Sequence, residues 1–340
     1  MSALHDLLAN EELMQKHDVD AEQVEFMIAL DGQVKAWVAT GGKDEKLQAT
    51  IMKALDSWTY SRLPYAIKNF PFVTSHKLKA FNRNPYIANE LYNKLTPSCK
   101  DNDKEYFQVG LAVDTYCTYG EKEFENRFLI KNRPDNITKE AAKAQNQVIL
   151  TESVGEVVKT CVNEYKSRHF FPERLLKTNF IAVINGLACK AEVDDWRPEE
   201  FRFGDLKTNR NVNSFLTDSG WKNYLLQGKF YYVLIILFPM KELDEQQIED
   251  FRRKLEGMLY VVDKYADFSR SHCFVFTNQT LNDGWGEING LIDRWKNAVD
   301  SNIWEWTFDL DNTDDLKLFN DCELYPILQG FKDQISPTRI

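Results

Sequence analysis

Three short β-like runs follow one another between residues 179 and 208, and they constrain the fold more than any other part of the chain. The first two lie in "NFIAVINGLACKAEVDDW" (179–196), on either side of Asn185-Gly186, a dipeptide typical of a two-residue hairpin turn. The third is the alternating run "EFRFGDLKT" (200–208). Together they predict a three-strand meander, and the helix-like segments around it predict an α/β fold.

Most of the remaining chain has helical patterns. Residues 1–70 are expected to be mainly helical, with a possible hairpin where Asp31-Gly32 interrupts "FMIALDGQVKAWVA" (26–39). A helix capped by Thr74 or Ser75 is expected to end before Pro85, where a second helix follows. Further helices are expected over residues 105–128, 138–168, 218–232, 243–264 and 286–300, with a strand over residues 272–278.

The composition is typical of a folded protein with a large core. Hydrophobic residues make up 43% of the 340 residues and include 22 Phe, 14 Tyr and 8 Trp. The N-terminus lacks an export signal, and the longest apolar run, "FYYVLIILF" (230–238), is too short to span a bilayer. We therefore expect a cytoplasmic protein that does not bind a membrane. The six cysteines lack the spacing of a zinc or iron–sulfur site.

The formal charge of −10 argues against a protein that binds nucleic acid through its overall charge alone. It does not exclude an enzyme acting on nucleic acid, because such an enzyme can gather its basic residues in one groove. Divalent cations can then offset the charge of an acidic site.

The third β-like run ends in Asp205-Leu206-Lys207, and Asp194 ends the run before it, eleven residues earlier. Asp205 and Lys207 are two residues apart on a strand, so their side chains point to the same face. Two converging carboxylates can hold a divalent cation, and a lysine beside them can orient water or stabilise negative charge. Because the acid-x-Lys pattern recurs elsewhere in the chain, the triplet is informative only together with its neighbours.

The segment "GLACKAEVDDWRPEEFRFGDLKT" (186–208) resembles the core of the PD-(D/E)xK nuclease superfamily, specifically its RecE/RecB-like branch, the exonuclease VIII type. Other segments resemble motifs of that branch and occur in its order: "VTSHKLKAFNRNPY" (73–86), "FQVGLAVDTYCTYGEKEFENRFLI" (107–130), "WKNYLLQGKFYY" (221–232) and "LIDRWKNAVDSNIWEW" (291–306). The resemblance covers roughly residues 70–308. It implies a restriction-endonuclease-like α/β core, in which helices flank a mixed central sheet, with a helical N-terminal addition.

The resemblance also implies a role for individual residues. Asp194 and Asp205 would bind the metal ion, Mg²⁺ or Mn²⁺, with the Leu206 carbonyl as a further ligand. Lys207 would be the catalytic lysine.

Three other positions have implied roles. Gln227 and Tyr231 form the QxxxY element, which would contact DNA or brace the site. Asp114 stands where the branch usually has histidine. Since aspartate is a good ligand for magnesium or manganese, Asp114 is expected to be a further metal ligand, although the change could equally mark a weakened site.

The expected domains are a helical N-terminal addition (1–68), the nuclease domain (69–308) and a C-terminal extension (309–340). The expected function is that of a metal-dependent DNA exonuclease acting on linear duplex or single-strand ends in recombination, repair or phage DNA metabolism. The chain could form a homo-oligomer, as relatives of this type often do, and residues 1–68 could recruit a strand-annealing protein.

Two alternatives remain open at this stage. The pattern "AEVDD…GDLKT…LLQ" also fits DXO-like enzymes that remove caps from RNA 5′ ends, with Glu192 as an extra ligand. The change at Asp114 could instead indicate a catalytically inactive nuclease fold that binds nucleic acid.

Overall fold

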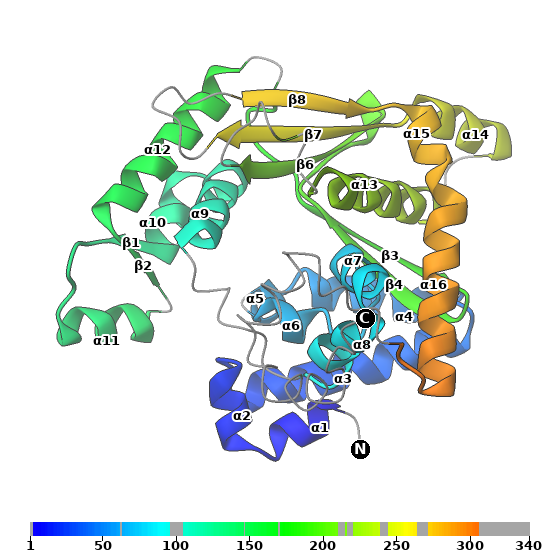
Figure 1. The fold of residues 1–340 in the computed structure, drawn as a ribbon, viewed down its shortest axis with the longest axis horizontal. Coiled ribbons are helices and arrows are strands. Elements are labelled where there is room, and N and C mark those ends of the chain that lie inside the picture. Colours follow the sequence, from blue (N-terminus) through cyan, green and yellow to red (C-terminus); the bar gives the residue numbers. More distant parts are fainter. Residues whose placement is uncertain are drawn as a thin grey trace, which may run out of the picture.

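The structure is a computed structural model that describes residues 3–61, 63–95, 105–145, 147–168, 171–209, 215, 220–238, 244–263 and 271–305. The expected C-terminal extension, 309–340, lies outside the described residues. The fold is a mixed α/β arrangement, with a sheet at one side and helices against both of its faces (Figure 1).

The elements fall into an N-terminal helical part and a mixed part. The helices up to residue 93 are α1 (Ala3–Leu8), α2 (Glu11–Lys16), α3 (Ala21–Ala39), α4 (Glu45–Leu55), α5 (Trp58–Ser61), α6 (Tyr65–Lys68), α7 (Ser75–Arg83), α8 (Pro85–Ala88) and the π-helix η1 (Asn89–Asn93). The later helices are α9 (Glu105–Tyr119), α10 (Glu121–Arg127), α11 (Asn136–Ala144), α12 (Glu152–Ser167), the short 3₁₀-helix η3 (Pro198–Glu200), α13 (Gly220–Leu237), α14 (Glu245–Lys254), α15 (Asn278–Asn282) and α16 (Gly284–Ser301). The strands are β1 (Phe128–Ile130), β2 (Val148–Leu150), β3 (Thr178–Ile184), β4 (Leu187–Val193), β5 (Asp195–Arg197), β6 (Arg202–Asn209), β7 (Glu256–Asp263) and β8 (Ser271–Phe276).

The expected three-strand meander is confirmed only in part: its first two strands form a hairpin, but its third strand, β6, pairs with the short strand β5 and not with β4. β3 and β4 form an antiparallel hairpin, and its two turn residues, Asn185 and Gly186, have φ values of 51° and 79°. Such a two-residue turn needs positive φ at both positions, which explains the Asn-Gly pair. The chain then passes through Asp194 into β5 and β6, which pair antiparallel at the edge of the larger sheet.

The larger sheet has the order β5-β6-β7-β8 and is mixed, because β6 and β7 run parallel while the outer pairs are antiparallel. Side chains of its central strands alternate between two cores. Phe203 and Leu259 belong to the core shared with α7, α13 and α16, whereas Leu206 and Tyr260 belong to the core shared with α9 and α12. The restriction-endonuclease-like core with its mixed central sheet and the helical N-terminal region are thus as the sequence predicts.

The possible hairpin at Asp31-Gly32 is wrong, because α3 runs through this dipeptide without interruption. A capping box between Asp20 and Gln23 starts the helix, and Asp31 pairs with Lys35 one turn along it. The buried side chains of α3 recur at helical spacing: Val24, Met27, Leu30, Val34 and Trp37. Burial of this stripe outweighs the turn preference of Asp-Gly.

Two expected helices are partly wrong, because each contains a strand. The segment 138–168 divides into α11, β2 and α12, and β2 pairs in parallel with β1. The segment 243–264 divides into α14 and β7, the strand between β6 and β8. β7 is buried on both faces, and its aromatic and β-branched residues suit such a position. The segment 105–128 is also interrupted, at Gly120, whose φ of 86° separates α9 from α10.

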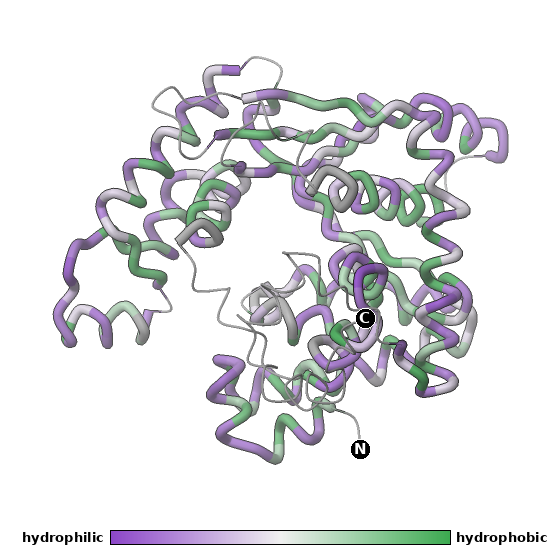
Figure 2. The backbone as a smooth tube through the Cα atoms, viewed as in Figure 1, coloured by the Kyte–Doolittle hydropathy of each residue, from purple (hydrophilic) through white to green (hydrophobic). Residues whose placement is uncertain are grey.

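Helix α13 extends beyond its expected end near Tyr232 and continues to Leu237. It packs against α7, α16, β3 and β4, so its apolar residues are buried on most sides. Burial around the helix therefore overrides the strand propensity of this run. In Figure 2 α13, β7 and the β3–β4 hairpin are largely hydrophobic, whereas α14 is largely hydrophilic. Among the described residues no helix is long and apolar enough to cross a membrane.

Candidate active site

The residues predicted from the strands and from α13 converge on one pocket of about 170 Å³. Its lining includes Asp194, Asp205, Lys207, Gln227 and Tyr231. These residues come from the β4–β5 junction, from β6 and from α13, so a turn, a strand and a helix together assemble the pocket.

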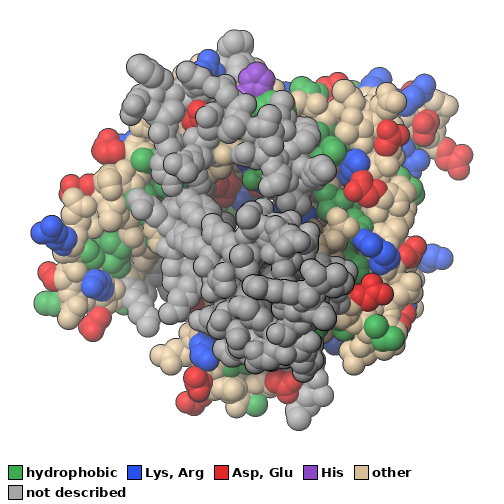
Figure 3. Space-filling view, viewed as in Figure 1, with side chains coloured by type: hydrophobic (Ala, Val, Ile, Leu, Met, Phe, Trp, Pro, Cys, Tyr) green, Lys and Arg blue, Asp and Glu red, His purple; other side chains and the backbone are tan. Residues whose placement is uncertain are grey.

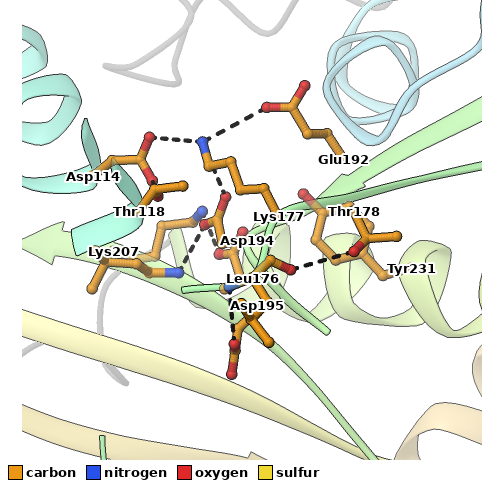
Figure 4. A network of polar contacts seen from close by, with 12 residues as sticks. Asp114, Thr118, Leu176, Lys177, Thr178, Glu192, Asp194, Asp195, Lys207 and Tyr231 are labelled. Carbon is orange, nitrogen blue, oxygen red and sulfur yellow. Dashed lines mark hydrogen bonds and ion pairs between the residues drawn. The ribbon is translucent and has the colours of Figure 1, made fainter. Parts of the chain in front are cut away.

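Asp194 and its neighbour Asp195 point in opposite directions (Figure 4). Asp194 faces the pocket, and its Oδ2 accepts a hydrogen bond of 2.9 Å from the Leu206 backbone N–H. Asp195 is fully buried on the other side, where it accepts from the Leu176 N–H (3.2 Å) and the Tyr260 hydroxyl (3.3 Å). The backbone alternation thus selects Asp194 for the pocket and leaves Asp195 to hold β5 in place.

Asp205 and Lys207 lie on the same face of β6 and form an ion pair. Gln227 donates to the Asp205 Oδ1 at 3.1 Å and to the Tyr231 hydroxyl oxygen at 2.6 Å. Gln227 and Tyr231 are one helical turn apart on α13, so both reach the same point of the pocket. The pair therefore braces Asp205, one of the two roles that the QxxxY spacing implied.

Lys79 is a residue of this site that the sequence analysis did not identify. It comes from α7, and its Nζ donates to the Gln227 Oε1 at 3.1 Å. Because the Asp205 carboxylate only accepts, the Gln227 amide has its nitrogen toward Asp205 and its oxygen toward Lys79. Burial, followed by the nearby Lys207 ammonium, lowers the pKa of Lys79 to about 7. A lysine on an amphipathic helix gives no signal in the sequence that it reaches a buried site.

Lys177 is the second residue that was missed. It directly precedes β3, and its Nζ lies 2.7 Å from the Asp114 Oδ2, 3.7 Å from the Glu192 Oε1 and 3.7 Å from the Asp194 Oδ1 (Figure 4). Burial alone would lower the pKa of Lys177, but the three carboxylates outweigh it and hold the pKa well above its ordinary value. Lys177 therefore stays charged among these acids.

Asp114, from α9, is brought near Asp194, but its carboxylate is paired with Lys177 and also accepts a bond of 3.4 Å from Thr118. Glu192 is likewise engaged by lysines, at 3.6 Å from Lys68 and 3.8 Å from Lys190 as well as by Lys177. Although burial opposes it, the lysine charges lower the pKa of Glu192 to about 2. Both acids thus have cationic partners within the protein.

Asp194 and Asp205 form the acid pair that could hold a metal ion. Burial and the neighbouring Asp205 carboxylate raise the pKa of Asp194, because two like charges are held close together away from water. A divalent cation would relieve this repulsion, and carboxylate oxygens are the ligands that Mg²⁺ and Mn²⁺ prefer. Within the described ranges no three acidic, histidine or cysteine side chains are arranged to hold a metal. Two carboxylates completed by water still fit Mg²⁺, which usually keeps several waters.

Residues 75–305 match the sequence profile of a family described as a PDDEXK-like domain of unknown function (DUF3799). No curated protein matches the chain. Among solved structures, a "Putative exonuclease" from Eubacterium rectale is similar to 72% of this chain and 87% of its own, with 14% sequence identity and a TM-score of 0.48. The family match spans well over half of the chain, so this protein belongs to the PDDEXK-like DUF3799 family and has the fold of a PD-(D/E)xK nuclease.

Proposed function

We propose that this protein is a nuclease that uses Mg²⁺ or Mn²⁺ to hydrolyse phosphodiester bonds at DNA ends. The observation that carries the proposal is the convergence of Asp194, Asp205 and Lys207 on one pocket, with Gln227 bracing Asp205. The order of motifs along the chain supports an exonuclease of the RecE type, working in recombination, repair or phage DNA metabolism.

Each residue of the pocket has a role in this chemistry. Asp194 and Asp205, with the Leu206 carbonyl, would hold the ion, which supplies positive charge at the scissile phosphate. The Lys207 ammonium can donate hydrogen bonds to the attacking water or to a phosphate oxygen as negative charge develops. The water oxygen bonds to phosphorus and gives up one proton, the bond to the leaving sugar oxygen breaks, and that oxygen takes up one proton.

The DNA backbone would be attracted by the lysines of the pocket and not by the charge of the whole surface. On the face in Figure 3 acidic and basic side chains are interspersed along both flanks. The pocket itself is lined by Lys68, Lys190 and Lys207, which suit a phosphate backbone. We further propose that Gln227 and Tyr231 contribute to DNA binding indirectly. Gln227 holds the Asp205 carboxylate in place, and Tyr231 holds Gln227. A homo-oligomer, and a strand-annealing partner bound by residues 1–68, stay predictions.

The RNA-decapping alternative has weaker support from the geometry. It requires Glu192 as an extra metal ligand, yet Glu192 is surrounded by Lys68, Lys177 and Lys190. A metal at Glu192 would have to displace these ammonium groups. The inactive-fold alternative rests on Asp114, whose pairing with Lys177 leaves the Asp194–Asp205 pair intact.

The proposal is tested by incubating end-labelled linear duplex DNA with Mg²⁺, Mn²⁺ or EDTA. We expect the wild type to release labelled nucleotides only with metal, and Lys207→Ala to release none. Lys159→Ala is a matched control, because Lys159 lies on α12, where its exposed side chain pairs with the exposed Glu156. If the wild type releases nothing with any metal, DNA is not the substrate, and capped RNA becomes the next one to test.

A further inference from the structure

Lys177 lies between three carboxylates that come from different elements. Asp114 belongs to α9, Glu192 to β4, and Asp194 to the β4–β5 junction. The Lys177 side chain is 20% exposed, and its Nζ is within 4 Å of all three acids. The Lys177 ammonium thus supplies the positive charge at a point that three carboxylates face.

The position lies beside the Asp194–Asp205 pair. The two carboxylate oxygens of Asp194 have different partners: Oδ2 accepts from the Leu206 N–H, and Oδ1 faces the Lys177 ammonium. Two-metal hydrolases place their ions about 3.5–4 Å apart around shared carboxylates. Because Glu192 also pairs with Lys68 and Lys190, a second ion would be held by Asp194 and Asp114, and it would need the space that the Lys177 ammonium fills.

The charges around Asp194 also argue against a second metal ion. The carboxylates of Asp114, Glu192, Asp194 and Asp205 are ion-paired with lysines within the described part of the chain: Lys68, Lys177, Lys190 and Lys207. Each of the four carboxyl groups thus has a lysine partner before any metal binds. One divalent ion can be balanced by a substrate phosphate, whereas a second would add two further positive charges beside acids that already have lysine partners in the described part of the chain.

We propose that Lys177 takes the place of a second metal ion, so that the site binds a single divalent cation. In this arrangement Asp114 is the partner of Lys177 and not a metal ligand in the wild-type protein. The inference rests on the proposed function, because it takes the single ion to be held by Asp194 and Asp205.

The test counts Mn²⁺ ions bound to the full chain without DNA, by calorimetric titration and by electron paramagnetic resonance. We expect one ion for the wild type and two for Lys177→Gln, with the magnetic coupling of a close ion pair. The double variant Asp114→Asn/Lys177→Gln should bind one again. Lys190→Gln is the matched control: Lys190 is also buried and pairs with Glu192, but its ion pairs do not include Asp114 or Asp194. It should bind one ion.

Two results would overturn the inference alone: a wild type that binds two coupled ions, or a folded Lys177→Gln that still binds one. If circular dichroism shows Lys177→Gln to be unfolded, Lys177→Met replaces it, and one ion bound by that variant counts equally against the inference. Other results would contradict the proposed function itself. If the wild type binds no Mn²⁺, or if Asp194→Asn binds it as tightly as the wild type, both the proposed function and the inference are wrong.

Discussion

The adjacent residues Asp194 and Asp195 should respond in opposite ways to the same substitution. Asp195 is fully buried and accepts hydrogen bonds from the Leu176 N–H, the Arg197 Nε and the Tyr260 hydroxyl, at 3.0 to 3.3 Å. Asparagine there removes the charge and turns an N–H₂ group toward donors. Since hydrogen bonds to charged groups contribute roughly 1.5–3 kcal/mol each, we expect Asp195→Asn to lower the free energy of unfolding by about 3 kcal/mol.

The charge of Asp194, unlike that of Asp195, destabilises the folded protein when no metal is bound. Burial and Asp205 raise the pKa of its carboxyl, so folding opposes its charge. Asparagine removes that charge, and its oxygen can still accept the Leu206 N–H. Each unit of pKa shift corresponds to about 1.4 kcal/mol, so even a partial release of the repulsion should stabilise Asp194→Asn by about 1–2 kcal/mol at neutral pH.

The sign of the pH dependence follows from the raised pKa. Below about pH 4 the Asp194 carboxyl is protonated in both the folded and the unfolded chain, so the variant and the wild type should be equally stable. As the pH rises toward about 8, the unfolded chain ionises first, and the wild type loses stability relative to Asp194→Asn.

Urea unfolding in EDTA, followed by tryptophan fluorescence at several pH values, measures both variants. Cleavage assays complete the comparison, because Asp194→Asn should be inactive although stable. If Asp194→Asn destabilises the protein as much as Asp195→Asn does, the opposite orientation of the two carboxylates is wrong.

Three further outcomes follow from the packing. Burial lowers the pKa of Lys77 to about 7, so Lys77→Met should be more stable than the wild type by a few kcal/mol at pH 7, and urea titrations should show this gain shrinking as the pH approaches 10. A methyl group at Gly204 would lie 2.4 Å from the Tyr260 ring, so calorimetry should find Gly204→Ala destabilised by about 1–3 kcal/mol, and an unchanged melting temperature would contradict this packing. Gln227→Ala should slow cleavage about 10–100-fold, whereas Tyr231→Phe should slow it only a few-fold; equal losses would show that Gln227 is not the main brace.

The part of the site that could be predicted from the sequence is the part that is local in the chain. Alternation along β6 places Asp205 and Lys207 on one face, and the hairpin brings Asp194 to the end of the neighbouring strand. The spacing of Gln227 and Tyr231 is one helical turn. Each of these relations depends only on residues that are close in sequence.

Lys79 and the pairing of Lys177 with Asp114 could not be predicted, because they join elements far apart in sequence; the approach of Lys177 to Asp194, by contrast, follows from the β3–β4 pairing of Thr178 with Val193. Lys79 reaches Gln227 across 148 positions, and Lys177 reaches Asp114 across 63. Taken alone, each lysine resembles an ordinary solvated side chain. Only the packing of α7 against α13, and of α9 against β6, shows what they contact.

The errors in the fold have a related physical cause. The helix formers of α14 lead directly into β7, so the charged pattern hides a strand whose position in the middle of the sheet depends on distant partners. In α3, burial of one helical stripe overrides the local preference of Asp31-Gly32 for a turn.

The most direct test of the proposed reaction compares linear duplex DNA with the same DNA as a covalently closed circle, in the presence of Mg²⁺. An exonuclease that works through Asp194, Asp205 and Lys207 should degrade the linear form to nucleotides and leave the circle intact. Lys207→Ala should degrade neither. Nicking of the circle, or degradation that survives in Lys207→Ala, would contradict the proposed reaction.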